Sequence, residues 1–369
     1  MTAVEKALSV CVAIYNIKEE ILRECIESLI RDKAENAEII LGDDCSDNGA
    51  DKICMEYAKK DSRIKYIRPE KNGGVSALRN KMTDAAKGKL ITFVDGDDVV
   101  SENYIKRISA AADGDWDIVM FGIRGFVSEL PPSDDISDGV RTITNNACIQ
   151  FSRACLTGEP PHAEDFGIKE STPSSVCIKA YRREFLKENN IRFAENVKKS
   201  QDTVFNTRAF FCCRSLGYIP DILYFYRKNP DSICNRYSKN FDKIMSACFE
   251  CDNKNLNELF GGSTEVRDAL YRYKIILIII DNFKLNIFHR DNPGNKDKRK
   301  SEFLEFVGSE PYKSFFENFD FDSYEWRERK LILKLAKNKN FGMLDFMYKH
   351  PITFKAYGWI KNKLSGAVR

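Results

Sequence analysis

The sequence predicts an α/β protein in which a mostly parallel sheet is flanked by helices and followed by a helical C-terminal region. Two observations in the first 120 residues carry this prediction. Short apolar runs alternate with amphipathic stretches, and the repeat of about 25–30 residues is typical of β–α–β units. A third observation is that helical patterns continue without strands after about residue 235.

Four apolar runs predict the strands of the parallel sheet, and an amphipathic stretch follows each run. The run 8–14 is apolar almost throughout, as expected of a strand buried on both faces. The stretch 18–33 places apolar residues at i, i+3 and i+4, which predicts a helix with one buried face. The same alternation predicts strands at 39–41, 64–67 and 90–94 and helices at 51–60, 75–86 and 104–112.

The pattern is weaker after this point. A strand is expected at 116–123, and a polar stretch with two adjacent prolines predicts a surface loop at 128–139. No interpretation follows for the rest of the stretch up to residue 172. Further on, the predicted elements are an ordered segment at 176–186, a helix at 203–211 and a strand at 223–226.

Composition excludes several classes of protein. Of the 369 residues, 43% are hydrophobic and 31% are charged, which suits a packed globular protein rather than a disordered or fibrous one. A net charge of +3 is too small to suggest a nucleic-acid partner. The most apolar run, 275–280, is far shorter than the ~20 residues that span a bilayer. Because no secretory signal is evident and the cysteines suit reduced thiols, we expect a cytoplasmic protein.

Acidic residues follow two of the predicted strands directly. The segment 43–47 (DDCSD) follows the second strand, and 95–98 (DGDD) follows the fourth. Such sheets bind ligands beyond the carboxyl ends of their strands, so both clusters are candidates for one site. Asp95 and Asp97, two residues apart, suit a hard cation such as Mg²⁺ or Mn²⁺. The alternative for the first cluster is that its aspartates cap the following helix.

A glycine pair opens the predicted third helix in the segment 72–80 (NGGVSALRN). Free N–H groups at a helix N-terminus attract phosphate, and Arg79 could add positive charge there. The alternative, which this segment alone favours, is an ordinary turn with Arg79 on the helix surface.

Four segments in this order resemble the glycosyltransferase family 2 domain, of the bacterial surface-polysaccharide type. They are 10–16 (VCVAIYN), 43–48 (DDCSDN), 72–80 (NGGVSALRN) and 93–98 (FVDGDD). The resemblance is strong over about residues 8–123, moderate over 173–232 and absent beyond. It implies a GT-A type, Rossmann-like fold and transfer of a sugar from a nucleotide-sugar with inversion at the anomeric carbon. Cys45 stands where glycine or another small residue is usual.

The resemblance implies a nucleotide-sugar site at the strand ends. The residues that match the family's binding positions are Ala13, Tyr15, Asp44, Arg79 and Asp95. Ala13 and Tyr15 would line the base pocket, and Asp44 would bond a uracil-type ring, so a UDP-sugar is the expected donor. Arg79 would lie near the nucleotide and Asp95 near the ribose.

The resemblance also implies a metal ligand and a catalytic base. Asp97 would hold Mn²⁺ or Mg²⁺ on the diphosphate, with Asp98 as the second candidate because the run of acids leaves the register ambiguous. The family's late Glu-Asp pair reads Gln201-Asp202 here, so one carboxylate is missing. Asp202 would be the base that deprotonates the acceptor hydroxyl. It would also be positioned to cap the helix that follows.

The expected domains are a catalytic domain at 1–235 and a helical C-terminal region at 236–369. Within the first, residues 1–123 would bind the nucleotide-sugar and 124–235 the acceptor, expected to be a glycan or a lipid-linked molecule. The tail, 325–369, has eleven basic and three acidic residues, which leaves a net charge of −5 on the rest. Aromatic residues among these bases suit contact with an anionic membrane surface, on the inner face of the membrane. The alternative is a helix packed on the protein with an exposed basic face.

Two other functions compete with this interpretation. The segment 95–99 (DGDDV) resembles the D-x-D-x-[TV] signature of haloacid dehalogenase type phosphohydrolases, in which Asp95 would be the nucleophile. That family carries its motif on the first strand, whereas three predicted strands precede it here. The second rival is a non-catalytic descendant that binds sugar or nucleotide, suggested by the acid missing at Gln201.

Overall fold

A computed structural model gives the fold of the chain. It describes residues 6–131, 139–143, 145–159, 166–168, 171–228, 235–322, 324 and 326–350, with the side chain of residue 145 excepted. By compactness the chain divides into two units. We call Met1–Asn229 together with Ala247–Val266 the sheet unit, and Pro230–Ser246 together with Arg267–Arg369 the helical unit.

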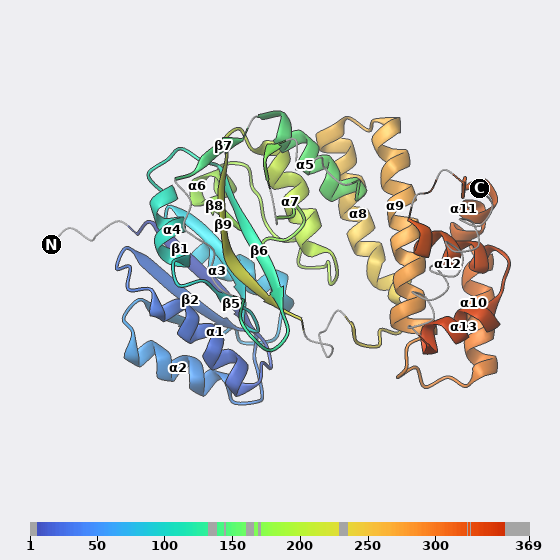
Figure 1. Ribbon diagram of the computed structural model, residues 1–369, viewed down its shortest axis with the longest axis horizontal. Helices are drawn as coiled ribbons and strands as arrows, with labels where there is room; N and C mark the ends of the chain where they lie inside the picture. Colours follow the sequence, from blue (N-terminus) through green and yellow to red (C-terminus); the bar gives the residue numbers. More distant parts are fainter. Residues whose placement is uncertain are drawn as a thin grey trace, which may run out of the picture. The chain divides into compact units, whose positions relative to one another are not determined.

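The first half of the sheet is parallel, as the sequence predicts (Figure 1). Its strands lie in the order β3-β2-β1-β4, and each neighbouring pair is parallel. Nearly every residue of the first two strands is buried, which explains why their apolar residues do not alternate with polar ones. The bounds are β1 (Leu8–Ile14), β2 (Ala37–Asp43), β3 (Ile64–Ile67) and β4 (Leu90–Asp95).

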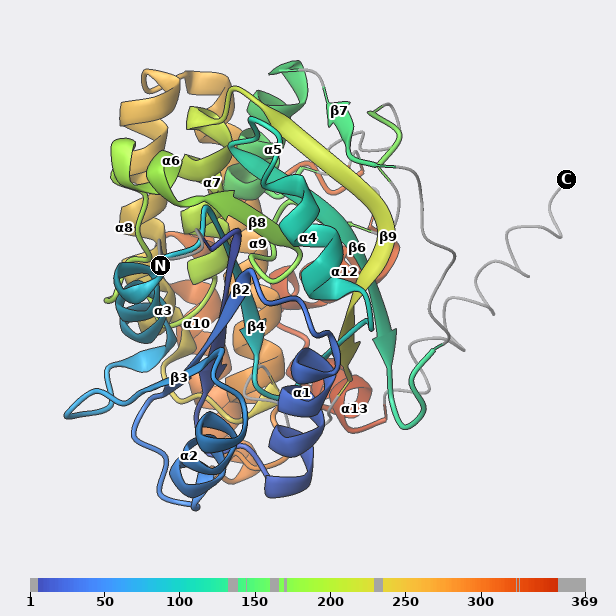
Figure 2. The ribbon, with the colours of Figure 1, turned by 90° about the vertical axis from the view of Figure 1, so that its left-hand side faces the viewer.

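Helices cover both faces of this half. The chain moves in one direction from β1 to β3 and then returns to β4, so right-handed crossovers put α1 and α2 on one face and α3 on the other. Figure 2 shows this arrangement. The helices are α1 (Glu19–Arg31), α2 (Ala50–Lys60), α3 (Gly74–Ala85) and, after β4, α4 (Tyr104–Ala111).

The second half of the sheet is mixed. From β4 the order continues β8-β6-β9-β5, with β7 paired to β9. Only β6 and β9 are parallel here, and the pairs of β8 with β4 and β6 and of β9 with β5 and β7 are antiparallel. The strands are β5 (Val99–Val100), β6 (Ile118–Phe126), β7 (Arg141–Ile143), β8 (Lys179–Arg182) and β9 (Leu216–Arg227), and the helices are α5 (Asn145–Thr157), α6 (Arg183–Glu188) and α7 (Gln201–Cys212).

Two elements of this half differ from the sequence prediction. β9 extends over Leu216–Arg227 although Pro220 lies inside it, and the register of β6 against β9 shifts at Gly122, which accommodates the irregularity. α5 occupies part of the stretch that the sequence left without interpretation. α5 packs on α7, where the rings of Phe151 and Phe210 lie 5.4 Å apart and Ser152 Oγ donates to the carbonyl of Thr207 at 2.6 Å.

An aromatic cluster joins the two halves of the sheet below the strand ends. Phe93 of β4 meets Phe193 edge-to-face at 5.3 Å, and Phe193 stacks on Phe205 of α7 at 4.2 Å. Tyr181 of β8 contacts Phe205 at 5.4 Å. All four rings are buried. This packing fixes α7 against the sheet and thereby sets the position of its first turn.

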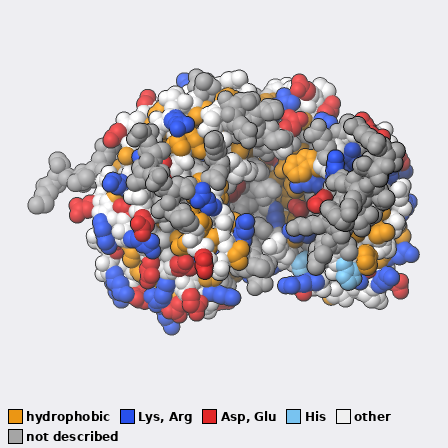
Figure 3. Space-filling view, viewed as in Figure 1, with side chains coloured by type: hydrophobic (Ala, Val, Ile, Leu, Met, Phe, Trp, Pro, Cys, Tyr) orange, Lys and Arg blue, Asp and Glu red, His pale blue; other side chains and the backbone are white. Residues whose placement is uncertain are grey.

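After residue 235 the described residues form helices joined by turns and short irregular segments, with no strand among them, which confirms the predicted helical C-terminal region. Within the helical unit, Arg299 and Asp345 form a buried ion pair at 2.7 Å. No helix in the described ranges is long and apolar enough to span a bilayer. On the face drawn in Figure 3, basic and acidic side chains are interspersed over the sheet unit. The helices are α8 (Phe241–Phe260), α9 (Thr264–Asn282), η3 (Phe283–Ile287), α10 (Lys296–Gly308), α11 (Tyr312–Asn318), α12 (Arg327–Lys337) and α13 (Phe341–Lys349).

Candidate active site

The carboxyl ends of β1, β2 and β4 meet at one edge of the sheet. Ala13 lies in register with Gly42 of β2 and with Asp95 of β4. The N–H of Gly96 donates to the carbonyl of Ala13 at 2.9 Å, and a Cβ on Gly96 would lie only 3.0 Å from that oxygen. Tyr15, just beyond β1, has 45% of its surface exposed. The structure therefore brings Ala13, Tyr15 and Asp95 together at the predicted edge.

The aspartates after β2 do not cap the following helix. Asp43 is buried and pairs with Arg68, and it also accepts a hydrogen bond from the Tyr66 hydroxyl at 3.0 Å. The residue before α2 is Gly49, which offers no side-chain cap. The capping alternative is therefore wrong for this cluster.

Asp44 occupies the N-terminus of α3. Its two carboxylate oxygens accept from the N–H groups of Gly73 and Gly74 at 2.9 and 2.7 Å. These amides, which the sequence offered as a phosphate site, thus hold a side chain of the protein itself. Cys45, the residue after Asp44, adopts a left-handed backbone with φ of 64°. That conformation explains why glycine suits this position.

Asp97 and Asp98 have different surroundings. Asp98 is buried, and its oxygens accept from the Tyr224 hydroxyl at 2.5 Å and from the N–H of Arg227 at 2.8 Å. Burial first, and the charge of Asp95 second, raise the pKa of the Asp98 carboxyl to about 8. The same two causes raise the pKa of Asp97. Asp98 is thus engaged by β9, which favours Asp97 as the residue that faces a ligand.

The acidic turn suits a divalent cation. The carboxylate of Asp95 raises the pKa of its neighbour Asp97, and a cation bound there would oppose this effect. No group of three or more potential metal-ligating side chains occurs among the described residues. Mg²⁺ is commonly held by one or two carboxylates together with water and substrate phosphates, so a pair is an adequate protein contribution.

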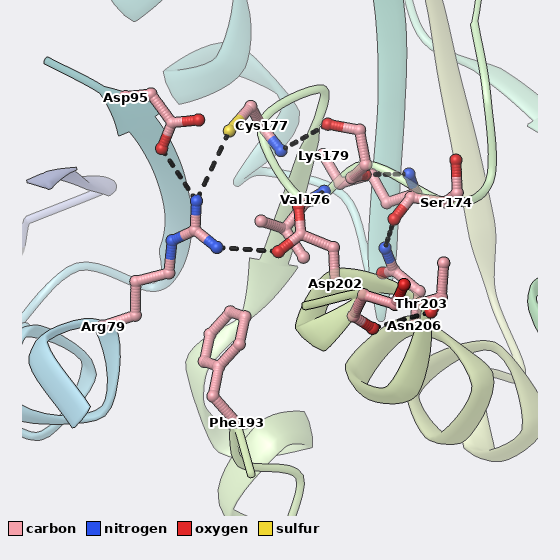
Figure 4. Close-up of polar contacts among 12 residues, drawn as sticks. Arg79, Asp95, Ser174, Val176, Cys177, Lys179, Phe193, Asp202, Thr203 and Asn206 are labelled. Carbon is pink, nitrogen blue, oxygen red and sulfur yellow. Dashed lines mark hydrogen bonds and ion pairs between the residues drawn. The ribbon is translucent and has the colours of Figure 1, made fainter. Parts of the chain in front are cut away.

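A buried arginine connects this edge to the second half of the domain (Figure 4). Arg79, 3% exposed, donates from Nη2 to Asp95 at 2.8 Å and from Nη1 to Asp202 at 2.7 Å. Its guanidinium carbon lies 5.3 Å from the centre of the Phe193 ring. Burial opposes the charge of Arg79, but the carboxylates of Asp202 and Asp95 raise its pKa. The alternative that places Arg79 on the helix surface is wrong.

Asp202 lies in the first turn of α7 but is not its N-cap, which is Ser200. One carboxylate oxygen accepts from Arg79, and the other accepts from the N–H of Val176 at 3.3 Å. The side chain keeps 26% of its surface exposed, so it is accessible from solvent. Gln201 is partly exposed beside it.

Sequence reasoning missed the residues that hold the acidic turn from β9. Arg227 donates from Nε to the carbonyl of Asp97 at 2.9 Å and pairs with Glu24 at 2.6 Å. The Tyr224 hydroxyl lies 3.2 Å from the N–H of Asp95, which donates to it. The available signal was the segment 224–227 (YFYR) at the end of the predicted strand. Its contacts could not be predicted, because the acidic turn that it holds is more than 120 residues away in sequence.

Comparison with known proteins agrees with this architecture. The fold matches that of S. aureus TarS residues 1–349, with a TM-score of 0.55 at 18% identity over 94% of this chain and 92% of that chain. The structure therefore has a TarS-like GT-A fold. Residues 9–156 match the model of "Glycosyl transferase family 2".

Relatives extend the match. EpsH of Bacillus subtilis (strain 168), which carries a provisional glycosyltransferase assignment, is 31% identical over 254 residues, covering 68% of this chain and 70% of EpsH. EpsJ of the same organism, an uncharacterised glycosyltransferase, is 33% identical over 231 residues, covering 61% of this chain and 62% of EpsJ. The chain belongs to glycosyltransferase family 2. This family assignment excludes the phosphohydrolase alternative.

TarS has also been solved with UDP and with UDP-GlcNAc, and these two structures match this chain with TM-scores of 0.50 and 0.51. TarS is described as a poly(ribitol-phosphate) beta-N-acetylglucosaminyltransferase.

Proposed function

We propose that this protein transfers a sugar from a UDP-sugar to a hydroxyl group of a glycan or lipid-linked acceptor, with inversion at the anomeric carbon. The observation that carries the proposal is the Arg79 bridge. It links Asp95, at the edge proposed to bind the nucleotide, to Asp202, proposed as the base, although Arg79 and Asp202 are 123 residues apart in sequence. One ion-pair network thereby joins the edge proposed to bind the nucleotide-sugar and the carboxylate proposed as the catalytic base.

In the proposed reaction Asp202 accepts the proton of the acceptor hydroxyl. The hydroxyl oxygen forms a bond to the anomeric carbon while the bond from that carbon to the UDP phosphate oxygen breaks, and UDP leaves with the electron pair. Arg79 and the N–H of Val176 orient the carboxylate for this step. A general base of this kind contributes about 10²–10⁴-fold to the rate.

Asp97, next to Asp95, would hold Mn²⁺ or Mg²⁺ at the diphosphate. The metal would offset the charge that develops on the leaving UDP, so no protein acid would be needed there. Ala13 and Tyr15 would border the base, with the exposed Tyr15 ring available for stacking. Asp44 would bond the uracil ring.

The relatives support a UDP-sugar as the donor and a role in making a cell-envelope glycan. Among them, TarS has been solved with UDP-GlcNAc, and TarS acts on poly(ribitol-phosphate). We infer a UDP-sugar donor and a role in making a cell-envelope polysaccharide or related glycan, at a cytoplasmic location.

A donor screen tests the proposal. Purified protein is incubated with a panel of UDP-sugars, with and without Mn²⁺, and release of UDP is measured. We expect Mn²⁺-dependent release from at least one donor, lost in Asp97→Asn and lowered by about 10²–10⁴-fold in Asp202→Asn, with both variants unfolding at the wild-type temperature. Retained turnover in Asp202→Asn would remove the base assignment. Calorimetric binding of UDP and Mn²⁺ without turnover of any donor would favour the non-catalytic descendant.

The helical unit exposes basic and aromatic side chains. On α12, Lys334 and Lys337 are exposed, with Lys334 also paired to Asp322, and Trp326 and Phe346 expose 57% and 51% of their surfaces. We propose that these side chains contact the inner face of the membrane, where a lipid-linked acceptor would lie. The rest of the predicted basic tail, 351–369, lies outside the described residues. Flotation with vesicles containing 30% phosphatidylserine, compared with neutral vesicles, tests this. Equal binding to both would contradict it.

A further inference from the structure

A completely buried lysine lies behind the proposed base. Lys179 on β8 has no exposed surface, and burial lowers the pKa of its ammonium group to about 8. Burying an ammonium group is unfavourable unless hydrogen bonds and nearby charges compensate. The chain tolerates this cost at a position away from the surface, and the contacts of Lys179 show what its ammonium group holds.

The ammonium group holds the loop that precedes β8. Its Nζ donates to the carbonyl of Thr172 at 2.9 Å and to the carbonyl of Ser175. The ring of Phe210 from α7 lies 5.5 Å from Nζ. Both acceptors are backbone groups of one loop, so the lysine fixes the path of that loop rather than another side chain.

One peptide group of the loop lies between Lys179 and Asp202 (Figure 4). Its carbonyl belongs to Ser175 and accepts from Lys179, and its N–H belongs to Val176 and donates to Asp202 at 3.3 Å. Because a peptide group is planar and rigid, fixing its oxygen also fixes the direction of its N–H. A cation at the carbonyl and an anion at the N–H both match the peptide dipole, so the two hydrogen bonds strengthen each other.

The neighbouring side chains support the same loop. Asn206, one turn after Asp202 on α7, donates from Nδ2 to the carbonyl of Ser174 at 2.9 Å. The hydroxyl of Tyr181, two residues after Lys179 on β8, donates to Asn206 at 2.7 Å. α7 and β8 thus hold the loop from both sides.

We propose that Lys179 is a positioning residue for transfer, which orients Asp202 through the Ser175–Val176 peptide without touching substrate. This inference rests on the proposed role of Asp202 as the base. Arg79 fixes one oxygen of the carboxylate, and the peptide held by Lys179 fixes the other. The charged groups around Asp202 are therefore Arg79 from α3, Asp95 from β4 and Lys179 from β8.

The test compares Lys179→Met, Asp202→Asn and the double variant. Turnover is measured as Mn²⁺-dependent UDP release with the donor found in the panel, and UDP affinity is measured by calorimetry with Mn²⁺ present. We expect Lys179→Met to lower kcat by about 10–100-fold, as for a displaced catalytic group. UDP affinity should stay within about twofold of wild type. The double variant should be no slower than Asp202→Asn, because two residues that act as a unit are not additive.

A matched control is available in the helical unit. Lys274 on α9 is also buried, at 1% exposed, and it lies outside the proposed site. Lys274→Met should leave both kcat and UDP affinity unchanged. Lys179→Gln, whose amide can still donate to a carbonyl, should recover part of the kcat that Lys179→Met loses.

Each outcome decides between distinct conclusions. Loss of activity in Asp202→Asn with wild-type kcat in Lys179→Met would overturn the role of Lys179 and leave the proposed function intact. Retained activity in Asp202→Asn would overturn the base assignment first. A kcat loss in Lys179→Met that multiplies with that of Asp202→Asn would show an effect independent of Asp202. If Lys179→Met and Lys179→Gln both fail to fold, Lys179 is required for the fold itself and the proposal is wrong.

Discussion

Replacing Arg79 with methionine would test whether the buried arginine holds the two halves of the site together. Methionine retains most of the length and apolar contact of the side chain but neither of its ion pairs, with Asp95 and Asp202. We expect a stability loss of about 2–3 kcal/mol and at least a ~100-fold loss of turnover, because both carboxylates lose the group that orients them.

The magnitude follows from the contacts. Two charge-assisted hydrogen bonds at about 1.5–3 kcal/mol each give about 3–6 kcal/mol. Some of this is offset because the Nε of Arg79 is buried without a partner, and removing it relieves about 1–3 kcal/mol. The carboxylates of Asp95 and Asp202, 40% and 26% exposed, can rehydrate in the variant, which keeps the net loss below that of a fully buried pair.

The assay is urea unfolding followed by circular dichroism, with stability taken from the midpoint and slope. A matched control is Arg192→Met, because Arg192 forms an exposed ion pair with Asp84 in which the two side chains are 44% and 58% exposed. We expect the control to lose about 0–1 kcal/mol. Equal losses in the two variants, or wild-type turnover in Arg79→Met, would refute the reasoning.

Three further predictions concern Lys179, the acidic turn and its support. Lys179 has a pKa of about 8 when folded, below its ordinary value of 10.5, so the unfolded chain binds more protons between these pH values. Wild-type stability relative to Lys179→Met should therefore rise by up to about 3 kcal/mol between pH 8 and 10.5 in urea unfolding, and a constant difference would contradict this. Gly96→Ala should destabilise the protein by about 1–3 kcal/mol and weaken UDP binding, because the new Cβ would lie 3.0 Å from the carbonyl oxygen of Ala13. The control is Gly342→Ala in α13, where a new Cβ would meet nothing within 4 Å, so it should be neutral or stabilising. Tyr224→Phe should lower stability by about 1–3 kcal/mol in thermal unfolding, because it leaves an oxygen of the buried Asp98 without its donor, and an unchanged melting temperature would argue against that role.

The parallel half of the fold was predictable because each strand and helix there has a strong local pattern. β1 is apolar except for Ser9, the centre of β2 is apolar from Ile39 to Leu41, and α1 buries one face at regular helical spacing. The location of the site residues at the strand ends could be predicted from the same pattern, because parallel strands bring their carboxyl ends to one edge of the sheet. The predicted meeting of Ala13, Tyr15 and Asp95 therefore needed no knowledge of distant contacts.

The second half was less predictable because tertiary packing overrides its local pattern. α5 buries Ala147, Cys148, Phe151 and Cys155, a helical spacing that small residues and cysteines make inconspicuous. β9 contains Pro220, which argues against a strand unless a register shift is known in advance. The contact of Arg79 with Asp202 depends on the docking of α7 through the Phe193–Phe205 stack, which no local signal reveals.

The Arg79 bridge also limits how this enzyme can be re-engineered. A chimera that joins the first 123 residues to the later half of a relative would place Arg79 and Asp202 in segments of different origin. Such an exchange would keep the network only where the incoming half supplies a carboxylate at the start of its matching helix. Under the proposed function, donor and acceptor preferences would therefore not be independent, and recombination would succeed best when this arginine and this aspartate are inherited together.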